Sequence, residues 1–180
     1  MHSTALLFFT SPLALALTLP PRAEPCDAAR QWTIPNVDYS SQITYSTPAH
    51  MATSRASIEF TYTSSTNSET SSCTGYSTGQ QDSGAFFAFP NPTGCTEAPG
   101  SATVSTFSYT GPTKNLNINE TFTCEGNTYL AAASTQLALQ CKETVYNNPN
   151  WTTPGDIYSA KTVACEPLSV ILTPHIFKLG

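Results

Sequence analysis

Hydrophobic and polar residues alternate along residues 114–124 (KNLNINETFTC). Leu116, Ile118 and Phe122 share one parity, whereas Asn119 and Thr121 share the other. Side chains two residues apart point to the same face of a β-strand, so this pattern predicts a strand with one buried and one solvent-facing side.

The same period recurs in other short segments, clearly in residues 56–62 and 102–109. Residues 129–141 combine helix-compatible alanines with an alternating end, and predict a strand or two strands joined by a bulge. Turn-rich stretches are expected at 64–72 and 91–100. Such short strands without a long amphipathic helix predict an all-β fold, a small antiparallel β-barrel or sandwich. Further strands are expected at 31–37, 41–45, 84–89, 157–163 and 168–172.

An apolar run occupies residues 5–19 and ends at Pro20 and Pro21. It is too short for a membrane-spanning helix, which needs about 20 apolar residues. Small residues such as Ala16 and Ala23 offer cleavage points. We therefore expect residues 1–20 to be a signal peptide, cleaved between about residues 16 and 23, and residues 21–180 to form a single secreted, extracellular β domain.

Charged residues are sparse, at 11% of the chain, and the net charge is −5. The seven Lys and Arg residues do not cluster, whereas a typical nucleic-acid binder makes roughly 6–10 phosphate contacts. We expect no nucleic-acid and no membrane partner. The chain has no Gly-rich phosphate loop after a strand and no H-E-x-x-H motif, so no cofactor is expected.

Six cysteines follow the predicted signal peptide. An even number in an exported protein predicts disulfides, although sequence alone leaves the pairing open. A metal site is disfavoured because there is no C-x-x-C motif, and His50 and His175 are not spaced from any cysteine as zinc ligands are. The six are Cys26, Cys73, Cys95, Cys124, Cys141 and Cys165.

Two triplets, beginning at Asn119 and Asn150, match the acceptor pattern for N-linked glycosylation. In the strand predicted for residues 114–124, Asn119 belongs to the polar face, so a glycan there would project into solvent.

Residues 75–79 (GYSTG) match the G-x-S-x-G nucleophile elbow, with Ser77 as the nucleophile. Asp156 and His175 follow in the order of α/β-hydrolases, and secreted fungal cutinases carry a very similar motif. An elbow needs an apolar strand before the serine and a helix after it, whereas polar segments flank this motif on both sides. We interpret it as a Ser-, Thr- and Gly-rich loop and keep a Ser77 esterase as the alternative function.

Glu120 interrupts the alternation by lying on the apolar parity. A lone carboxylate there is more often at a strand rim or in a bulge than catalytic, so we expect a structural role. A glycosidase needs two opposed carboxylates, and Glu59, Glu125 and Glu143 are the other possible members. Solvated charges are the simpler interpretation.

Several of these segments together resemble the Alt a 1-like family of secreted fungal allergens and effectors. The resemblance is carried by Cys26 followed by Trp32, by residues 58–60 (IEF), by residues 116–124 and by residues 137–141 (LALQC). It implies a β-barrel-like fold, no established catalytic mechanism and a role at the boundary between fungus and host.

The resemblance also implies bridges Cys73–Cys95 and Cys124–Cys141. Cys26 and Cys165 then remain and predict a third bridge within the chain, and hence a monomer. The family suggests the alternative, a homodimer linked through Cys26. The extension past Cys141, which includes Cys165, departs from the family pattern.

These observations predict a secreted, non-enzymatic protein that binds a host or extracellular protein, a glycan or a small apolar ligand. The alternative is a small secreted serine esterase that uses Ser77, Asp156 and His175.

Overall fold

The computed structural model describes residues 25–48, 52–66, 68–80, 87–152 and 155–180. The predicted signal peptide, His50 and the start of the strand predicted at 84–89 lie outside these residues. The described chain consists of antiparallel strands without helices, which confirms the all-β prediction. The strands are β1 Trp32–Tyr45, β2 Ala52–Ser64, β3 Thr70–Gln80, β4 Thr93–Thr96, β5 Val104–Thr110, β6 Asn115–Cys124, β7 Asn127–Gln136, β8 Cys141–Asn147, β9 Ser159–Cys165, β10 Leu168–Leu172 and β11 His175–Lys178.

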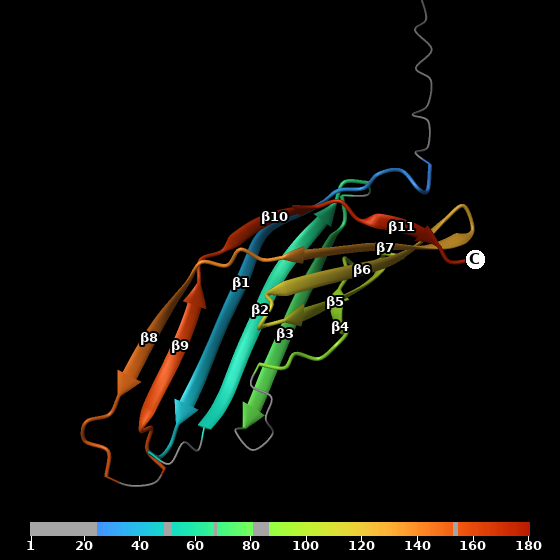
Figure 1. Cartoon of the computed structure of the whole chain (residues 1–180). Helices are drawn as coiled ribbons and strands as arrows, with labels where there is room; N and C mark the ends of the chain where they lie inside the picture. The colour runs from blue at the N-terminus through green and yellow to red at the C-terminus, as the bar shows by residue number, and fades with distance from the viewer. Residues whose placement is uncertain (1–24, 49–51, 67, 81–86, 153–154) are drawn as a thin grey trace, which may run out of the picture.

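The strands form one sheet that folds over on itself into an open half-barrel. Its order is β11-β7-β6-β5-β4-β3-β2-β1-β9-β8, and β10 pairs with the start of β1. Figure 1 shows β5, β6 and β7 crossing one end of the long strands β1, β2 and β3, while β8 and β9 extend the long layer sideways. The strand β4 links the two layers, because it pairs with β3 on one side and β5 on the other.

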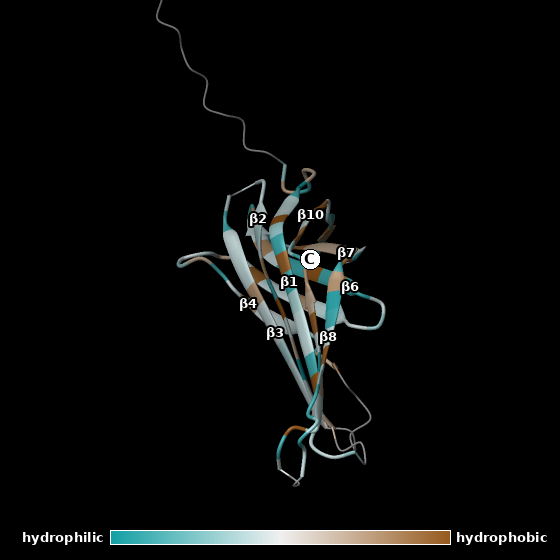
Figure 2. Ribbon diagram, turned by 90° about the vertical axis from the view of Figure 1, so that its left-hand side faces the viewer, coloured by the Kyte–Doolittle hydropathy of each residue, from teal (hydrophilic) through white to brown (hydrophobic). Residues whose placement is uncertain are grey.

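The hydrophobic core lies where the two layers face each other. Trp32, Tyr62 and Phe107 are fully buried there, together with apolar residues of β6. In the view of Figure 2, the molecule narrows away from this two-layered end. Toward the narrow end, β3 is mostly white, the colour of residues with intermediate hydropathy. Burial of the core rings stabilises the fold, at roughly 25 cal/mol per Å² of apolar surface removed from water.

Strands with alternating hydrophobic residues were predictable, whereas others were not. The expected strands 31–37 and 41–45 are one strand, β1, with a register shift between Ile34 and Val37. The expected loop 75–79 is wrong, because it lies within β3, whose inward residues are small rather than apolar. Of the strand predicted at 129–141, the part up to Gln136 belongs to β7. The next strand, β8, begins only at Cys141.

Three disulfides staple the sheet, and the described residues include no free cysteine. The predicted Cys73–Cys95 bridge is confirmed and joins β3 to β4. The predicted pairs Cys124–Cys141 and Cys26–Cys165 are wrong. The observed bridges are Cys26–Cys124 and Cys141–Cys165.

The corrected pairing follows from strand neighbourhood. Cys141 and Cys165 lie directly opposite each other on β8 and β9, whereas β6, which ends at Cys124, is not a neighbour of β8. Cys26 belongs to the segment before β1 and meets Cys124 at the end of β6. Cys26 is therefore engaged within its own chain.

Candidate binding face

The residues of the predicted esterase are not brought together. Ser77 lies on the inward side of β3 and is 3% exposed, and its hydroxyl has no hydrogen-bond partner among the described residues. His175 begins β11, which four other strands separate from β3 along the sheet, and Asp156 is exposed in the connection between β8 and β9. The strand before the serine is antiparallel to its neighbour, and no helix follows it in the described chain. This geometry does not form a nucleophile elbow.

Packing explains the glycine that opens the GYSTG motif. A Cβ atom on Gly75 would lie 3.0 Å from Cζ of Phe107 and 3.3 Å from Cγ2 of Ile58. Gly75 thus lets β3 approach the buried Phe107 ring closely. The first glycine of the motif therefore has a packing role in the core.

Glu120 is buried, and not at a strand rim or in a bulge as expected. It accepts a hydrogen bond from Arg30 at 3.2 Å and another from the hydroxyl of Tyr62 at 3.0 Å. The Tyr62 hydroxyl also lies 2.6 Å from Oγ of Ser105. The Arg30 guanidinium lies over the ring of Phe122, 3.4 Å from its centroid. Every polar group of this cluster has a partner, which supports the structural role predicted for Glu120.

Burial controls the ionisation of this cluster. It raises the pKa of Glu120, against the lowering effects of the Tyr62 hydrogen bond and the Arg30 charge. Burial likewise lowers the pKa of Arg30, which Glu120 raises, and it raises the pKa of Tyr62. The ion pair therefore offsets only part of the desolvation cost of both charges.

The other glutamates proposed for a glycosidase site lie apart. Glu59 is exposed on β2, Glu143 on β8 forms an ion pair with Lys161 at 2.7 Å, and Glu125 lies in the turn between β6 and β7. Their different elements and partners do not form a pair of carboxylates across a cleft. Among the described residues no group of three or more His, Cys, Asp or Glu side chains is arranged to hold a metal.

The candidate binding surface is the outward side of the five strands β8, β9, β1, β2 and β3. We call this surface the tyrosine face. Cross-strand register places its residues in rows, because opposite residues share a face. Most of its side chains are small, being serine, threonine or alanine, so the surface between its two tyrosines is shallow. Its members are Lys142, Thr144, Tyr146, Ala160, Thr162, Ala164, Ser40, Gln42, Thr44, Thr53, Arg55, Ser57, Tyr76 and Thr78.

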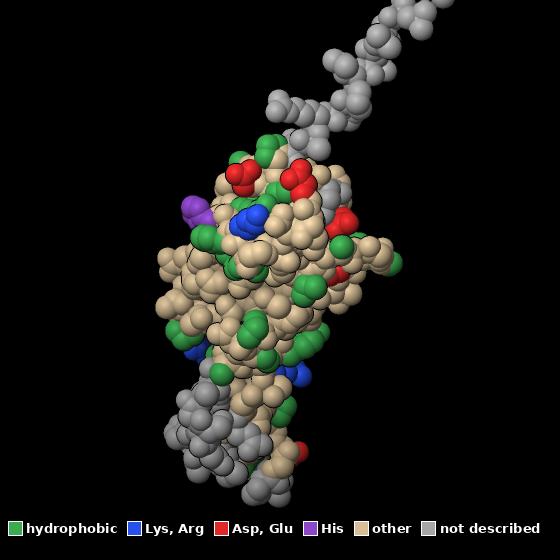
Figure 3. Space-filling model, turned by 90° about the vertical axis from the view of Figure 1, so that its right-hand side faces the viewer, with side chains coloured by type: hydrophobic (Ala, Val, Ile, Leu, Met, Phe, Trp, Pro, Cys, Tyr) green, Lys and Arg blue, Asp and Glu red, His purple; other side chains and the backbone are tan. Residues whose placement is uncertain are grey.

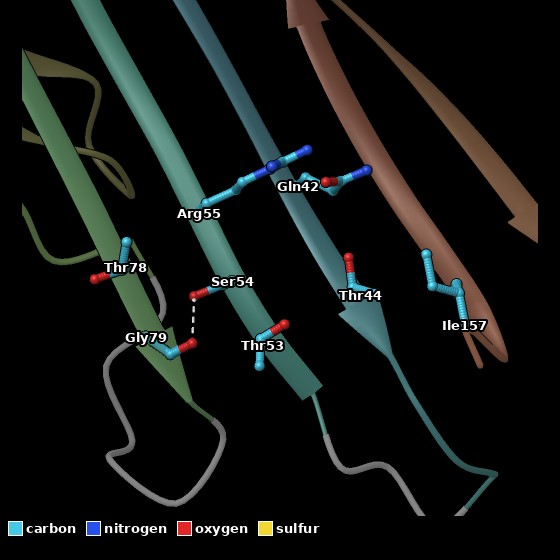
Figure 4. Close-up of a pocket in the computed structure, with 8 residues that line it drawn as sticks. All are labelled: Gln42, Thr44, Thr53, Ser54, Arg55, Thr78, Gly79 and Ile157. Carbon is cyan, nitrogen blue, oxygen red and sulfur yellow. Dashed lines mark hydrogen bonds between the residues drawn. The ribbon is translucent and has the colours of Figure 1, made fainter. Parts of the chain in front are cut away.

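Two hollows of about 730 and 310 Å³ lie on this side of the sheet and share Gln42 and Arg55. Figure 4 shows the larger one, with the Arg55 side chain reaching across β1 toward Gln42. The amide of Gln42 donates a hydrogen bond to Thr162 at 3.2 Å. Within the described chain, Arg55 is exposed and its guanidinium makes no hydrogen bond or ion pair. Its five donors are available to a ligand.

The two tyrosines lie at opposite sides of this face. Tyr76 is 63% exposed on β3, and its hydroxyl donates to Glu59 at 3.2 Å. That hydrogen bond raises the pKa of Tyr76, because it stabilises the protonated hydroxyl beside a carboxylate. Tyr146 is 53% exposed on β8, the outermost strand. This surface could not be predicted from the sequence, because β3 and β8 lack hydrophobic alternation.

These features define a disulfide-stapled antiparallel β protein with an open half-barrel. Residues 36–165 match the model of the Alternaria alternata allergen 1 family, so the chain belongs to this family. This match confirms the predicted Alt a 1-like resemblance, and members of the family are secreted proteins. No curated protein and no solved structure matches the chain. No described helix has the length and apolar character needed to span a membrane.

Proposed function

We propose that the protein is a secreted, non-enzymatic binding protein that contacts an extracellular partner through the tyrosine face. The observation that carries this proposal is the exposed and unpaired Arg55 on a shallow polar surface flanked by Tyr76 and Tyr146. Arginine and tyrosine are enriched among residues that dominate binding energy at interfaces. The hollows are open at the surface, which suits a macromolecular partner better than a small apolar ligand.

Capture of a partner from host extracellular fluid tests the proposal when it is combined with variants. The variants Arg55→Ala and Tyr76→Ala are expected to lower the amount captured by the immobilised protein at least tenfold. Controls are Lys178→Ala and Phe177→Ala, which remove a cation and an exposed ring from β11, away from this face. Equal capture by all four variants would show that the tyrosine face is not the contact surface.

A second measurement addresses the esterase alternative. We expect no hydrolysis of a short-chain p-nitrophenyl ester above background, because Ser77 has neither a histidine partner nor solvent access. Turnover that is abolished by Ser77→Ala would contradict the proposal. Ser105→Ala, which also removes a buried hydroxyl, controls for loss of folding.

A further inference from the structure

The glycosylation triplet at Asn119 lies on the outward side of the layer formed by β5, β6 and β7. Asn119 is exposed on β6 and lies in one row with Ala132 of β7 and His175 of β11. These three strands are side by side in Figure 1. The accepting amide is therefore accessible in the folded protein, although its neighbour Glu120 is buried.

A hollow of about 450 Å³ adjoins this amide. Asn119, Ala132 and His175 line it together with Ile171 of β10 and Phe177 of β11. Ile171 is 61% exposed and Phe177 is 52% exposed. The volume falls within the roughly 300–1,000 Å³ of ordinary small-ligand sites. On the face drawn in Figure 3, hydrophobic side chains are mostly scattered among polar ones.

We propose that Asn119 carries an N-linked glycan whose first sugars lie in this hollow against Phe177 and Ile171. N-acetylglucosamine has an apolar C–H face and an acetyl methyl group, which suit an exposed aromatic ring, and its hydroxyls remain in water. Phe177 has no aromatic partner among the described residues. The glycan thus covers apolar surface that the fold leaves exposed.

The chemistry requires export, and in this respect the inference rests on the proposed function. In the secretory pathway, Nδ2 of Asn119 forms a bond to the anomeric carbon of a lipid-linked oligosaccharide pyrophosphate. The lipid pyrophosphate leaves, and the amide nitrogen loses one proton. Transfer occurs on the unfolded chain, so the later position of Asn119 in a strand does not prevent it.

The other triplet provides an internal comparison. Asn150 is exposed in the connection between β8 and β9, and the neighbouring Trp151 ring already packs against Tyr158 at a centroid distance of 5.6 Å. A glycan on Asn150 would therefore meet a neighbouring ring that already has an aromatic partner. Its removal is expected to leave stability and dye binding unchanged.

The test begins with the protein secreted by a eukaryotic host. Intact mass before and after endoglycosidase treatment should show a glycan that is lost in Asn119→Gln and in Thr121→Ala, and kept in Thr121→Ser. An unmodified Asn119 in the secreted protein would overturn the proposal. Secretion without a glycan would contradict the glycan proposal but leave the proposed binding function unaffected. Failure of the one can therefore be distinguished from failure of the other.

Contact with the hollow is tested by trimming the folded glycoprotein with the enzyme, which avoids a folding defect. Trimming should raise the fluorescence of a hydrophobic dye at least twofold and lower Tm by about 2–4 °C. Both changes should be much smaller in Phe177→Ser, as a double-mutant cycle requires for interacting groups. Equal changes with and without Phe177 would show that the glycan does not lie in the hollow.

Discussion

The Glu120 carboxylate lies where three distant parts of the chain meet. Arg30 comes from the segment before β1, Tyr62 from β2 and Glu120 from β6. The side chains of Arg30 and Glu120 are only 10% and 3% exposed. Because burial outweighs the attraction between the charges, the cluster is expected to fix the position of these segments more than it adds net stability.

Removal of Arg30 is therefore expected to be costly. Arg30→Met leaves Glu120 buried without its cation and should lower the free energy of unfolding by about 3–5 kcal/mol at neutral pH. The pKa of Glu120, already raised by burial, rises further in this variant. The folded variant then takes up a proton at higher pH than the wild type does, so the loss of stability shrinks as pH falls. Urea unfolding across a pH series measures this difference.

Two variants control for this prediction. Arg55→Met removes an exposed arginine that has no carboxylate partner in the described chain, and should change stability little at any pH. Glu120→Gln added to Arg30→Met removes the unpaired charge and should recover part of the loss. A loss from Arg30→Met that did not vary with pH would contradict the assigned role of Glu120.

Two glycines on neighbouring strands should respond differently to replacement by alanine. Gly75→Ala places a methyl group 3.0 Å from the fully buried Phe107 ring. Such overpacking costs about 1–3 kcal/mol, more than the roughly 0.5–1 kcal/mol that alanine gains over glycine in a strand. Apart from its two chain neighbours, Gly94 on β4 has no residue with an atom within 4 Å of the added methyl, so Gly94→Ala should be neutral or stabilising. Thermal unfolding of both variants checks the signs, and a stable Gly75→Ala would show that β3 can move away from Phe107.

At the scale of the elements, burial on one face explains which strands were predictable. The strand β6 buries Leu116, Ile118 and Phe122 beneath a polar outer face, and its pattern is visible in the sequence. The inward side of β3 carries small residues such as Gly75 and Ser77, so no hydrophobic period appears. All side chains of β8 are exposed, and this strand depends on its ladder with β9 and on its disulfide. The tyrosine face was not predictable, because its two outer strands β3 and β8 lack hydrophobic alternation.

The β8 edge provides a prediction at this scale. Replacing both Cys141 and Cys165 with serine should loosen β8 locally, because no buried side chain holds that strand to the sheet. Amide hydrogen exchange in β8 should accelerate by at least an order of magnitude, while exchange in the buried strand β6 stays unchanged. Uniform acceleration across both strands would instead show that this bridge supports the whole fold.

For the whole molecule, the bridge between Cys26 and Cys124 determines how the N-terminal segment is held. It closes a loop with a sequence separation of 98, so the chain-entropy model gives it about 4.7 kcal/mol. The other two bridges span 22 and 24 residues and constrain the unfolded chain less. The sequence predicted that all six cysteines form disulfides but not this pairing, because pairing depends on which strands become neighbours.

This pairing predicts a monomer in solution without a free thiol, since it engages the cysteine that the family resemblance assigns to a bridge between two protomers. On a non-reducing gel the protein should run at the mass of one mature chain, and alkylation without reduction should add no mass. Peptide mapping should recover Cys26 joined to Cys124. The variant that tests the alternative replaces both Cys26 and Cys124 with serine, because Cys26→Ser alone would free Cys124 to form a new link. A dimer band that disappears on reduction, and in this double variant, would establish the intermolecular bridge instead.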